Sequence, residues 1–303
     1  MEKTIDLEQL RTFALVLELG SFSAAAERLG LTQPAVSVQV KKLERALSVR
    51  LVERVGRRVS ATSAGTDLLA QVPHVATAVA NAVNAATFHA AGVSGTVRLG
   101  TGLTPCLYFL PAVLHGLRKR YPSLQIVVST GNTEDYVRQI EGNIVDVALV
   151  TLPVHSRAIA ATPVLEDDFV AICRRGTCQW PDAVTAEMLS EQPLVKLGNG
   201  TTTRTLVDEW LRQGMGPLRP PAMEFDSVEA IKAIVAAGLG CAVLPRMAVT
   251  GPGKHKDLEM RPLEPRLRRT LALILRQDKP VNRSLKKVLE AITDGTRVFK
   301  PKD

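Results

Sequence analysis

Residues 22–47 constrain this chain more than any other segment, because two short amphipathic stretches flank a three-residue hinge at 30–32. Three alanines at 24–26 keep one face of the first stretch thin enough for a close helix crossing, and Ser23 is its expected N-cap. This pattern is typical of a helix-turn-helix. Any small helical hairpin can show the same pattern, so the segments that follow have to decide between the two interpretations.

The second stretch has the sequence of a helix that is free to dock on one side. Thr32 is a natural N-cap, and Pro34 lies in the first turn, where its missing N–H costs nothing. Apolar residues recur at helical spacing and are expected to be buried: Val36, Val40, Leu43 and Leu47. Polar residues are expected on the opposite side: Gln33, Ser37, Gln39, Lys41 and Lys42.

Residues 51–59 predict two short strands around a glycine turn, with arginines near the tip. Between residues 33 and 60 there are seven lysines and arginines and two acids. That excess suits neutralisation of a phosphate backbone. The hairpin is therefore interpreted as a basic wing beside the docking helix. The candidate DNA contacts are Ser23, Thr32, Gln33, Pro34, Ser37, Gln39, Lys41, Arg54, Arg57 and Arg58.

Several stretches of the first sixty residues closely resemble the LysR-type transcriptional regulators. They are Leu-Glu-Gln-Leu-Arg-Thr-Phe at 7–13, Gly-Ser-Phe-Ser-Ala-Ala-Ala at 20–26, Gln-Pro-Ala-Val-Ser at 33–37, Leu-Glu at 43–44 and Glu-Arg at 53–54. The resemblance implies a bacterial regulator that binds double-stranded promoter DNA and a small-molecule effector. It also implies self-association, as a dimer and usually a tetramer, with RNA polymerase as a further partner.

The resemblance assigns roles to particular residues. By position, Gln33, Pro34 and Ser37 would reach base edges, and Arg57 would enter the minor groove. Two residues depart from the commonest pattern of the family: Val38 replaces a basic residue, and Val52 replaces a phenylalanine.

The composition agrees with this interpretation but would not establish it by itself. The 303 residues carry a formal net charge of +8, but much of the excess lies in the last fifty residues and is interpreted as ordinary solvated surface. We expect a cytoplasmic protein that does not contact membranes. The N-terminus lacks a charged-then-apolar leader, and no stretch approaches the roughly 18 apolar residues of a membrane span.

Residues 63–92 are rich in alanine and valine and predict a long linker helix between a DNA-binding domain at 1–62 and the rest of the chain. Pro73 predicts a bend near residues 69–72. Apolar residues at alternating spacings of four and three form the expected dimerisation stripe: Leu68, Val72, Val75, Val79, Ala82 and Ala86. The alternative is an ordinary core helix of a monomer.

Beyond a glycine hinge at 92–95 the chain alternates strands with helices, which makes the fold class α/β with parallel sheets. Strands are expected at 96–100, 125–129, 145–150, 169–173, 194–197, 223–225, 241–244 and 270–275. Helices are expected at 110–120, 133–141, 203–213 and 228–237. The resemblance implies an effector-binding domain at 93–303, made of two Rossmann-like subdomains like those of periplasmic binding proteins. Subdomain I would comprise 93–164 and 268–303, and subdomain II 165–267.

In such folds, ligands bind beyond the carboxyl ends of the strands, where helices begin. Segments rich in glycine and threonine at 101–106, 130–133 and 198–204 meet that requirement. The candidate effector-binding residues are Gly102, Leu103, Thr104, Asn132, Thr133, Thr151, Thr201, Thr202, Thr203 and Arg204. The alternatives are that the threonines act only as helix caps and that Arg204 pairs with an acid.

The cysteines and histidines favour no metal or catalytic site. Cys106, Cys173, Cys178 and Cys241 are scattered and lack zinc-type spacing, and the histidines are isolated. A redox role remains open for Cys106, because the first turn of a helix can lower the pKa of a thiol.

The sequence therefore predicts a ligand-responsive, sequence-specific transcription factor with no catalysed reaction, no metal and no cofactor other than a small anionic effector. Three alternatives remain: a redox-responsive regulator that uses Cys106, a cytoplasmic solute-binding or enzymatic α/β protein, and a purely architectural DNA binder. The second would leave residues 33–44 and the wing unexplained, and the third would need no ligand cleft.

Overall fold

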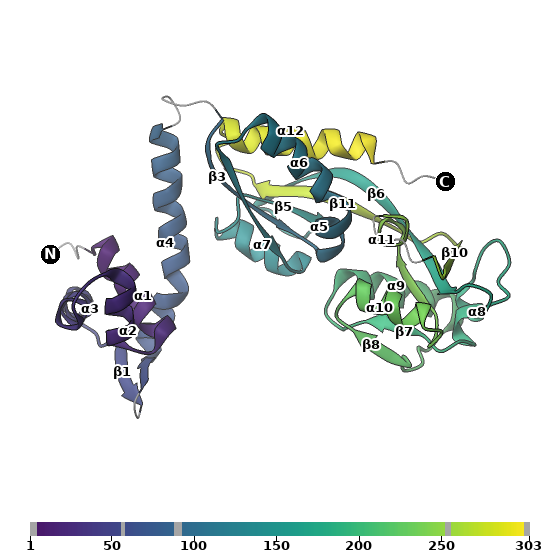
Figure 1. The fold of residues 1–303 in the computed structure, drawn as a ribbon, viewed down its shortest axis with the longest axis horizontal. Coiled ribbons are helices and arrows are strands. Elements are labelled where there is room, and N and C mark those ends of the chain that lie inside the picture. Colours follow the sequence, from purple (N-terminus) through teal and green to yellow (C-terminus); the bar gives the residue numbers. More distant parts are fainter. Residues whose placement is uncertain (1–4, 56–57, 88–92, 252–255, 300–303) are drawn as a thin grey trace. The chain divides into compact units, whose positions relative to one another are not determined.

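The computed structural model describes residues 5–55, 58–87, 93–251 and 256–299. The chain divides into two compact units, Met1–Val83 and Asn84–Asp303, and each is described by itself. The first unit combines helices with a small hairpin, and the second is a mixed α/β structure (Figure 1).

The first unit contains α1 (Leu7–Leu19), α2 (Phe22–Leu29), α3 (Gln33–Leu47), β1 (Val52–Val55), β2 (Arg58–Ala61) and α4 (Ser63–Thr87). Gly20 and Gly30 end α1 and α2 in the left-handed conformation, with φ of +63° and +65°, which glycine adopts at little steric cost. The helix-turn-helix predicted around the hinge is confirmed.

The N-caps of this unit correct one prediction and confirm another. Ser21, not Ser23, caps α2 by accepting a hydrogen bond from the Ala24 N–H at 3.3 Å. The helix begins earlier than expected because Phe22 packs on the core, which leaves Ser23 exposed inside it. Thr32 caps α3 as expected, accepting from the Ala35 N–H at 3.4 Å.

The core of the first unit uses the face of α3 that the sequence predicts. Val36, Val40 and Leu43 are buried, and they pack with residues of α1 such as Phe13. Leu47 is partly buried at the edge of the same cluster. The opposite face of α3 is therefore left to solvent.

The hairpin is joined to α3 by a carboxylate. Strands β1 and β2 pair antiparallel, and Glu44 of α3 accepts hydrogen bonds from the backbone N–H groups of Leu51 (2.8 Å) and Val52 (3.3 Å). The Val59 N–H of β2 donates to the Gly20 carbonyl at 2.9 Å. The hairpin is thus held from both sides.

Helix α4 continues through Pro73, and the bend expected there stays a prediction. Its first half belongs to the core of the first unit, because Leu68, Val72 and Val75 pack against that core. Of the expected dimerisation stripe, Val79 and Ala82 are exposed, and the side chain of Ala86 lies outside the described residues. The stripe is therefore not uniformly free for a partner helix.

The second unit contains a sheet in the order β10-β6-β11-β5-β3-β4, with β9 also paired to β6, and a small parallel sheet of β7 and β8. The strands of both sheets are β3 (Gly95–Thr101), β4 (Leu124–Thr130), β5 (Val147–Thr151), β6 (Ile159–Arg174), β7 (Val195–Leu197), β8 (Met223–Phe225), β9 (Ala242–Pro245), β10 (Leu258–Pro262) and β11 (Arg268–Arg276). Its helices are α5 (Leu103–Tyr108), α6 (Leu110–Arg120), α7 (Thr133–Glu141), α8 (Ala186–Ser190), α9 (Thr202–Met215), α10 (Val228–Ala236), α11 (Arg246–Thr250) and α12 (Arg283–Val298).

Figure 1 shows two lobes joined by the long strands β6 and β11, which pair antiparallel from Asp168↔Arg268 to Ile159↔Arg276. In the first lobe β3 pairs parallel with β4 and β5, with α6 and α12 on one side of the sheet and α7 on the other. The second lobe contains α8 to α10, β7 and β8, together with β9, β10 and one end of β6. Each lobe has its own buried apolar clusters.

The structure extends the predicted elements in two ways. The strand expected at 169–173 is the end of the sixteen-residue β6, whose first half is mostly half-buried or exposed. Elements β10, α8, α11 and α12 are additional. The C-terminal charge that the sequence assigned to plain surface lies partly on α12, whose other face buries Leu285, Val288 and Ile292. The subdomain boundaries at 164 and 267 and the domain limits at 62 and 92 stay predictions.

The contact of Glu44 with the hairpin is tested by substitution. Glu44→Ala leaves the backbone N–H groups of Leu51 and Val52, at the start of the hairpin, without their acceptor, so the free energy of unfolding of the first unit should fall by about 1–3 kcal/mol. Glu44→Gln keeps an oxygen acceptor and should lose less. Chemical denaturation monitored by circular dichroism measures both variants, and equal losses would contradict the proposed role of the carboxylate oxygen.

Candidate nucleic-acid interface and ligand cavity

The outer face of α3 brings together most of the residues predicted to contact DNA. Gln33, Pro34 and Lys41 are exposed, and Ser37 is half-buried on the same face. Thr32 is exposed at the start of the helix, and Ser23 is exposed on α2. Val38, at 50% exposure, adds an apolar side chain to this face. Methyl groups of this kind can contact a thymine methyl in the major groove.

Gln39 corrects the predicted set. Its side-chain oxygen accepts a hydrogen bond from the hydroxyl of Thr12, a residue of α1 that is 1% exposed. The contact ties α3 to α1 and occupies the acceptor that a base contact would use. Helical spacing places Gln39 at the boundary between the two faces, so only the tertiary contact decides its role.

The hairpin presents Arg54 and Arg58 to solvent on its two strands. Arg54 pairs in register with Val59, and Arg58 with Val55, so the two arginines lie close to the turn. Arg57, the predicted minor-groove residue, lies outside the described residues. The two strands carry Arg54 and Arg58, and Glu53 is the one acidic residue on their described positions. The described strands are therefore positively charged.

A cavity of about 260 Å³ lies between the two lobes of the second unit and contains most of the predicted effector residues. From that set it is lined by Gly102, Leu103, Thr104, Asn132, Thr133, Thr151, Thr201, Thr202 and Thr203. Pro105, Thr130 and Gly131, which belong to the predicted segments, also line it, and lining residues outside those segments include Leu197, Asp226, Val228 and Arg269. A larger, mainly apolar hollow between α6 and α12 contains none of the predicted residues.

Helices α7, α9 and α10 all begin at this cavity, at Thr133, Thr202 and Val228. Helix N-termini direct backbone N–H groups and a partial positive charge toward the space that they face. Two of the predicted residues act here as caps: Asn132 accepts from the Asp135 N–H at 2.8 Å, and Thr201 accepts from the Arg204 N–H at 3.1 Å. The capping alternative is therefore correct for these two side chains.

The remaining threonines divide into bonded and unbonded hydroxyls. Thr133 donates to the Thr151 carbonyl at 3.3 Å, and Thr203 accepts from Arg269 at 3.3 Å. Thr104 and Thr151 are each 7% exposed, and among the described residues the structure gives their hydroxyls no hydrogen-bond partner. Both residues line the cavity, and a hydroxyl without a protein partner can donate to or accept from a ligand, so these two hydroxyls are well placed to bind one.

Arg269 of β11 forms the base of the cavity and pairs with Asp167 of β6. The Asp167 carboxylate accepts from Arg269 Nε (3.0 Å) and Nη2 (2.8 Å) and from the Met247 N–H (3.1 Å). Burial raises the pKa of Asp167, and the charge of Arg269 offsets part of that effect. The charge of Arg269 is therefore largely compensated within the protein. The one feature of the sequence that could have pointed to Arg269 is its position next to the apolar strand expected at 270–275.

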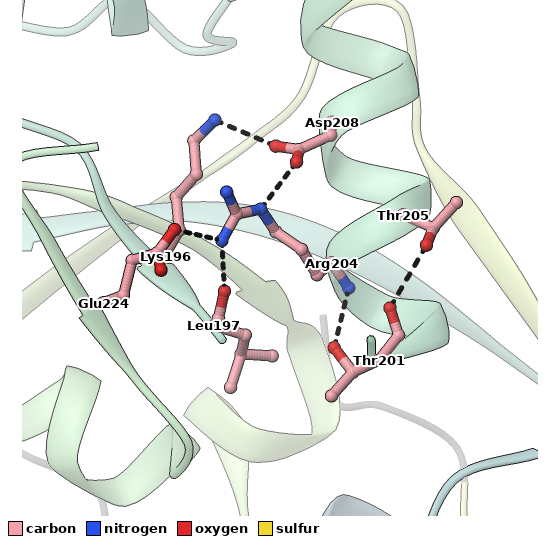
Figure 2. Close-up of polar contacts among 7 residues, drawn as sticks. All are labelled: Lys196, Leu197, Thr201, Arg204, Thr205, Asp208 and Glu224. Carbon is pink, nitrogen blue, oxygen red and sulfur yellow. Dashed lines mark hydrogen bonds and ion pairs between the residues drawn. The ribbon is translucent and has the colours of Figure 1, made fainter. Parts of the chain in front are cut away.

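Arg204 is absent from the cavity lining and belongs to a separate ion cluster, as Figure 2 shows. Its Nε contacts Asp208 at 2.6 Å, and its Nη1 contacts Glu224 at 2.9 Å and also donates to the Leu197 carbonyl. Lys196 binds the other oxygen of Asp208 at 2.8 Å. The effector role predicted for Arg204 is replaced by the structural alternative, because a nearby acid one helical turn away, at i+4, captures the guanidinium.

Burial and charge compete at Asp208. Burial raises the pKa of this carboxyl group, but the hydrogen bonds and charges of Lys196 and Arg204 outweigh burial and leave the pKa below its ordinary value. The cluster therefore stabilises the fold only while Asp208 is ionised.

A buried lysine joins the lobes next to the cavity. Lys232 of α10 is 1% exposed and donates to the hydroxyl of Tyr108 (3.0 Å), to Glu229 (2.9 Å) and to the Ala248 carbonyl (2.9 Å). Tyr108 ends α5, the helix that carries Thr104. The contact therefore connects α10 and α11 with the element that presents Thr104 to the cavity.

The cysteines are arranged differently from the sequence expectation. Cys173, Cys178 and Cys241 gather in one apolar cluster of the second lobe, because β6 and β9 pair there. Burial raises the pKa of Cys173 and of Cys241 to about 12. Burial also raises the pKa of Cys106, so the lowered pKa expected from a helix start is wrong. A thiol with a raised pKa forms less of the reactive thiolate.

No group of three or more histidine, cysteine, aspartate and glutamate side chains among the described residues could hold a metal ion. No described helix is long and apolar enough to cross a membrane.

Family comparisons match both units. The family described as "Bacterial regulatory helix-turn-helix protein, lysR family" matches residues 7–66, and the family described as "LysR substrate binding domain" matches residues 90–297. Together these matches include the outer face of α3, the hairpin and the whole cavity lining.

Individual relatives agree along nearly the whole chain. The chain is 33% identical over 287 residues to the uncharacterised HTH-type transcriptional regulator YeiE of Escherichia coli K12, covering 94% of this chain and 96% of YeiE. It is 31% identical over 271 residues to the HTH-type transcriptional activator CmpR of a Synechocystis species, covering 86% and 88% of the two chains. Its fold is similar to that of full-length CbnR complexed with its target DNA, with a TM-score of 0.76, 19% identity and coverage of 96% and 100%.

The ion cluster around Asp208 predicts an acid-sensitive contribution to stability. Because the folded pKa lies below the unfolded value of about 3.9, the contribution is present above that pH and is lost as the pH falls toward the folded pKa. Asp208→Asn should lower the free energy of unfolding by about 1.5–3 kcal/mol at pH 7, and the difference from wild type should shrink below about pH 4. Urea unfolding across this pH range measures it, and a difference that stays constant would contradict the assignment.

Proposed function

The chain belongs to the LysR family of bacterial transcriptional regulators, is not an enzyme, and from this premise we propose that it binds promoter DNA under the control of a small anion held between the lobes of its second unit. The single observation that carries the proposal is the cavity at Thr104 and Thr151, where two lining hydroxyls have no partner among the described residues and helices begin.

The proposed DNA contacts follow from the first unit. Gln33 and Ser37 would contact base edges in the major groove, and Arg54, Arg57 and Arg58 would bind phosphates or the minor groove. The contact of Glu44 with the hairpin supports this arrangement, since it fixes the hairpin to the helix that reads the bases. The complete predicted set of DNA-contacting side chains, Gln39 excepted, stays within this proposal.

The proposed effector is a small anion, because the cavity offers helix N-termini and threonine hydroxyls to it. Such a ligand would contact Thr104, Thr133 and Thr151 from the first lobe and Thr202 from the second. It shifts the balance between two arrangements of the lobes only to the extent that it binds one of them more tightly. Closure around the ligand supplies that difference.

The remaining parts of the proposal concern assembly and location. Exposed Val79 and Ala82 on α4 would contribute to a dimer that places two hairpins on one face of the DNA, and a tetramer would pair two such dimers. A regulator of this kind acts in the cytoplasm, where the chromosome lies, and contact with RNA polymerase at the promoter is part of the prediction. The raised pKa of Cys106 does not favour the redox alternative.

Two substitutions in the first unit test DNA binding. Gln33→Ala should relax sequence preference at one base pair, at a cost of about 1–3 kcal/mol on the preferred site. Arg58→Ala should weaken binding to all sequences and lower the slope of log affinity against log salt by about 1. Arg118→Ala on α6 is a matched control outside the interface. Electrophoretic mobility shifts on promoter and random duplexes measure these effects, and unchanged affinities in both variants would overturn the docking assignment.

The cavity is tested with the full chain and a panel of inorganic and organic anions. An anion that binds should raise the melting temperature of the wild type, and it should bind Thr104→Val and Thr151→Val about tenfold more weakly, the effect of losing one hydrogen bond of about 1.4 kcal/mol. Valine keeps the shape of threonine without the hydroxyl. An anion that stabilises both variants as well as the wild type binds elsewhere and would contradict the proposed site.

A further inference from the structure

Asp226 is the cavity residue that a simple anion does not explain. It follows β8 directly, at the carboxyl end of the small parallel sheet, and it lines the cavity from the second lobe. The structure gives its carboxylate no hydrogen-bond or ion-pair partner among the described residues. An acid at the carboxyl ends of parallel strands occupies the edge of the sheet where ligands of such folds bind.

The chain makes room for this carboxylate at a glycine. A Cβ atom added to Gly198 would lie 2.3 Å from Oδ1 of Asp226, so the carboxylate occupies the space directly above the Gly198 backbone. Gly198 directly follows β7 and donates its N–H to the Phe225 carbonyl at 3.0 Å, which fixes the two strand ends beside each other. Any larger residue at 198 would displace Asp226.

Asp226 is exposed to the cavity and has no positively charged partner in the lining. Arg269, the other charged lining residue, is bound to Asp167 and Thr203. The unbonded hydroxyls of Thr104 and Thr151 lie in the first lobe, whereas Asp226 lies in the second. The one carboxylate of the lining therefore lies on the lobe opposite these two hydroxyls. A ligand that carries only negative charge would face this carboxylate, which disfavours its binding.

We propose that the cavity takes a small zwitterion, an α-amino acid, whose carboxylate binds at Thr104 and Thr151 and whose ammonium group binds Asp226. This inference rests on the proposed function and specifies its ligand class. A ligand of this kind connects the lobes through its two ends, so both lobes contact it only when the cavity is closed. The ligand therefore binds the closed arrangement more tightly than the open one, which is the difference in affinity that a ligand-driven change requires.

A stabilising role in α10 is the competing explanation for Asp226. The residue precedes the N-cap Ser227, which makes no side-chain capping bond, and an acid near a helix N-terminus favours the helix. This role would affect stability without affecting which ligands bind. Ligand selectivity therefore separates the two explanations.

The experiment uses the full-length protein and matched pairs of ligands that differ only at the amino group. The twenty common amino acids and their 2-oxo acid counterparts, together with sulfate and phosphate, are assayed by thermal shift, and each hit is titrated calorimetrically. At least one amino acid should bind about tenfold or more tightly than its 2-oxo acid. Asp226→Asn should weaken binding of that amino acid at least tenfold and leave binding of the 2-oxo acid unchanged or tighter.

Two further variants complete the test. Gly198→Ala should reproduce the selectivity of Asp226→Asn by displacing the carboxylate, and Asp182→Asn, at an exposed acid outside the cavity, should leave selectivity unchanged. A 2-oxo acid or inorganic anion that binds as well as every amino acid would overturn the zwitterion and leave the anion cavity standing. Failure of the whole panel to bind would overturn both proposals.

Discussion

The buried ion pair between Asp167 and Arg269 is the contact on which the second unit most depends. It joins β6 and β11, the two strands that pass between the lobes, and the same carboxylate accepts a hydrogen bond from the Met247 N–H in the first turn of α11. Removing one member would leave an unpaired buried charge, which commonly costs about 3–5 kcal/mol. Arg269 also donates a hydrogen bond to Thr203, and both residues line the cavity. The same arginine therefore joins the two long strands and forms part of the cavity wall.

Local patterns predicted the first unit well because its helices depend on local chemistry. The caps, the glycines at 20 and 30 and the apolar spacing of α3 all act within a few residues. The second unit was predicted less completely. Apolar and polar residues do not alternate regularly in the first half of β6, so its pairing with β11 is what identifies this segment as a strand. Helix α12 was missed because its charged residues obscured an apolar face that appears only against β3 and α6.

The cavity residues divide in the same way. Threonines 104, 133, 151, 202 and 203 were predictable because each lies at the end of a strand or at the start of a helix. Arg204 satisfied the same rule and failed, since Asp208 and Glu224 neutralise it. Helical spacing reveals Asp208, at i+4, but it does not reveal Glu224, which lies on β8. Asp226 and Arg269 were missed because their relation to the cavity depends on residues far away along the chain. These residues are Gly198, 28 positions from Asp226, and Asp167, 102 positions from Arg269.

The three acceptors around Lys232 limit how the lobes can move. An ammonium group that is 1% exposed cannot exchange these acceptors for water unless the surrounding core opens. A wide opening of the lobes would have to break the bond to Tyr108, whereas a rotation whose axis passes near that hydroxyl would preserve it. A motion that keeps this bond would therefore turn the lobes about the contact between α10 and α5, the helix that also carries Thr104.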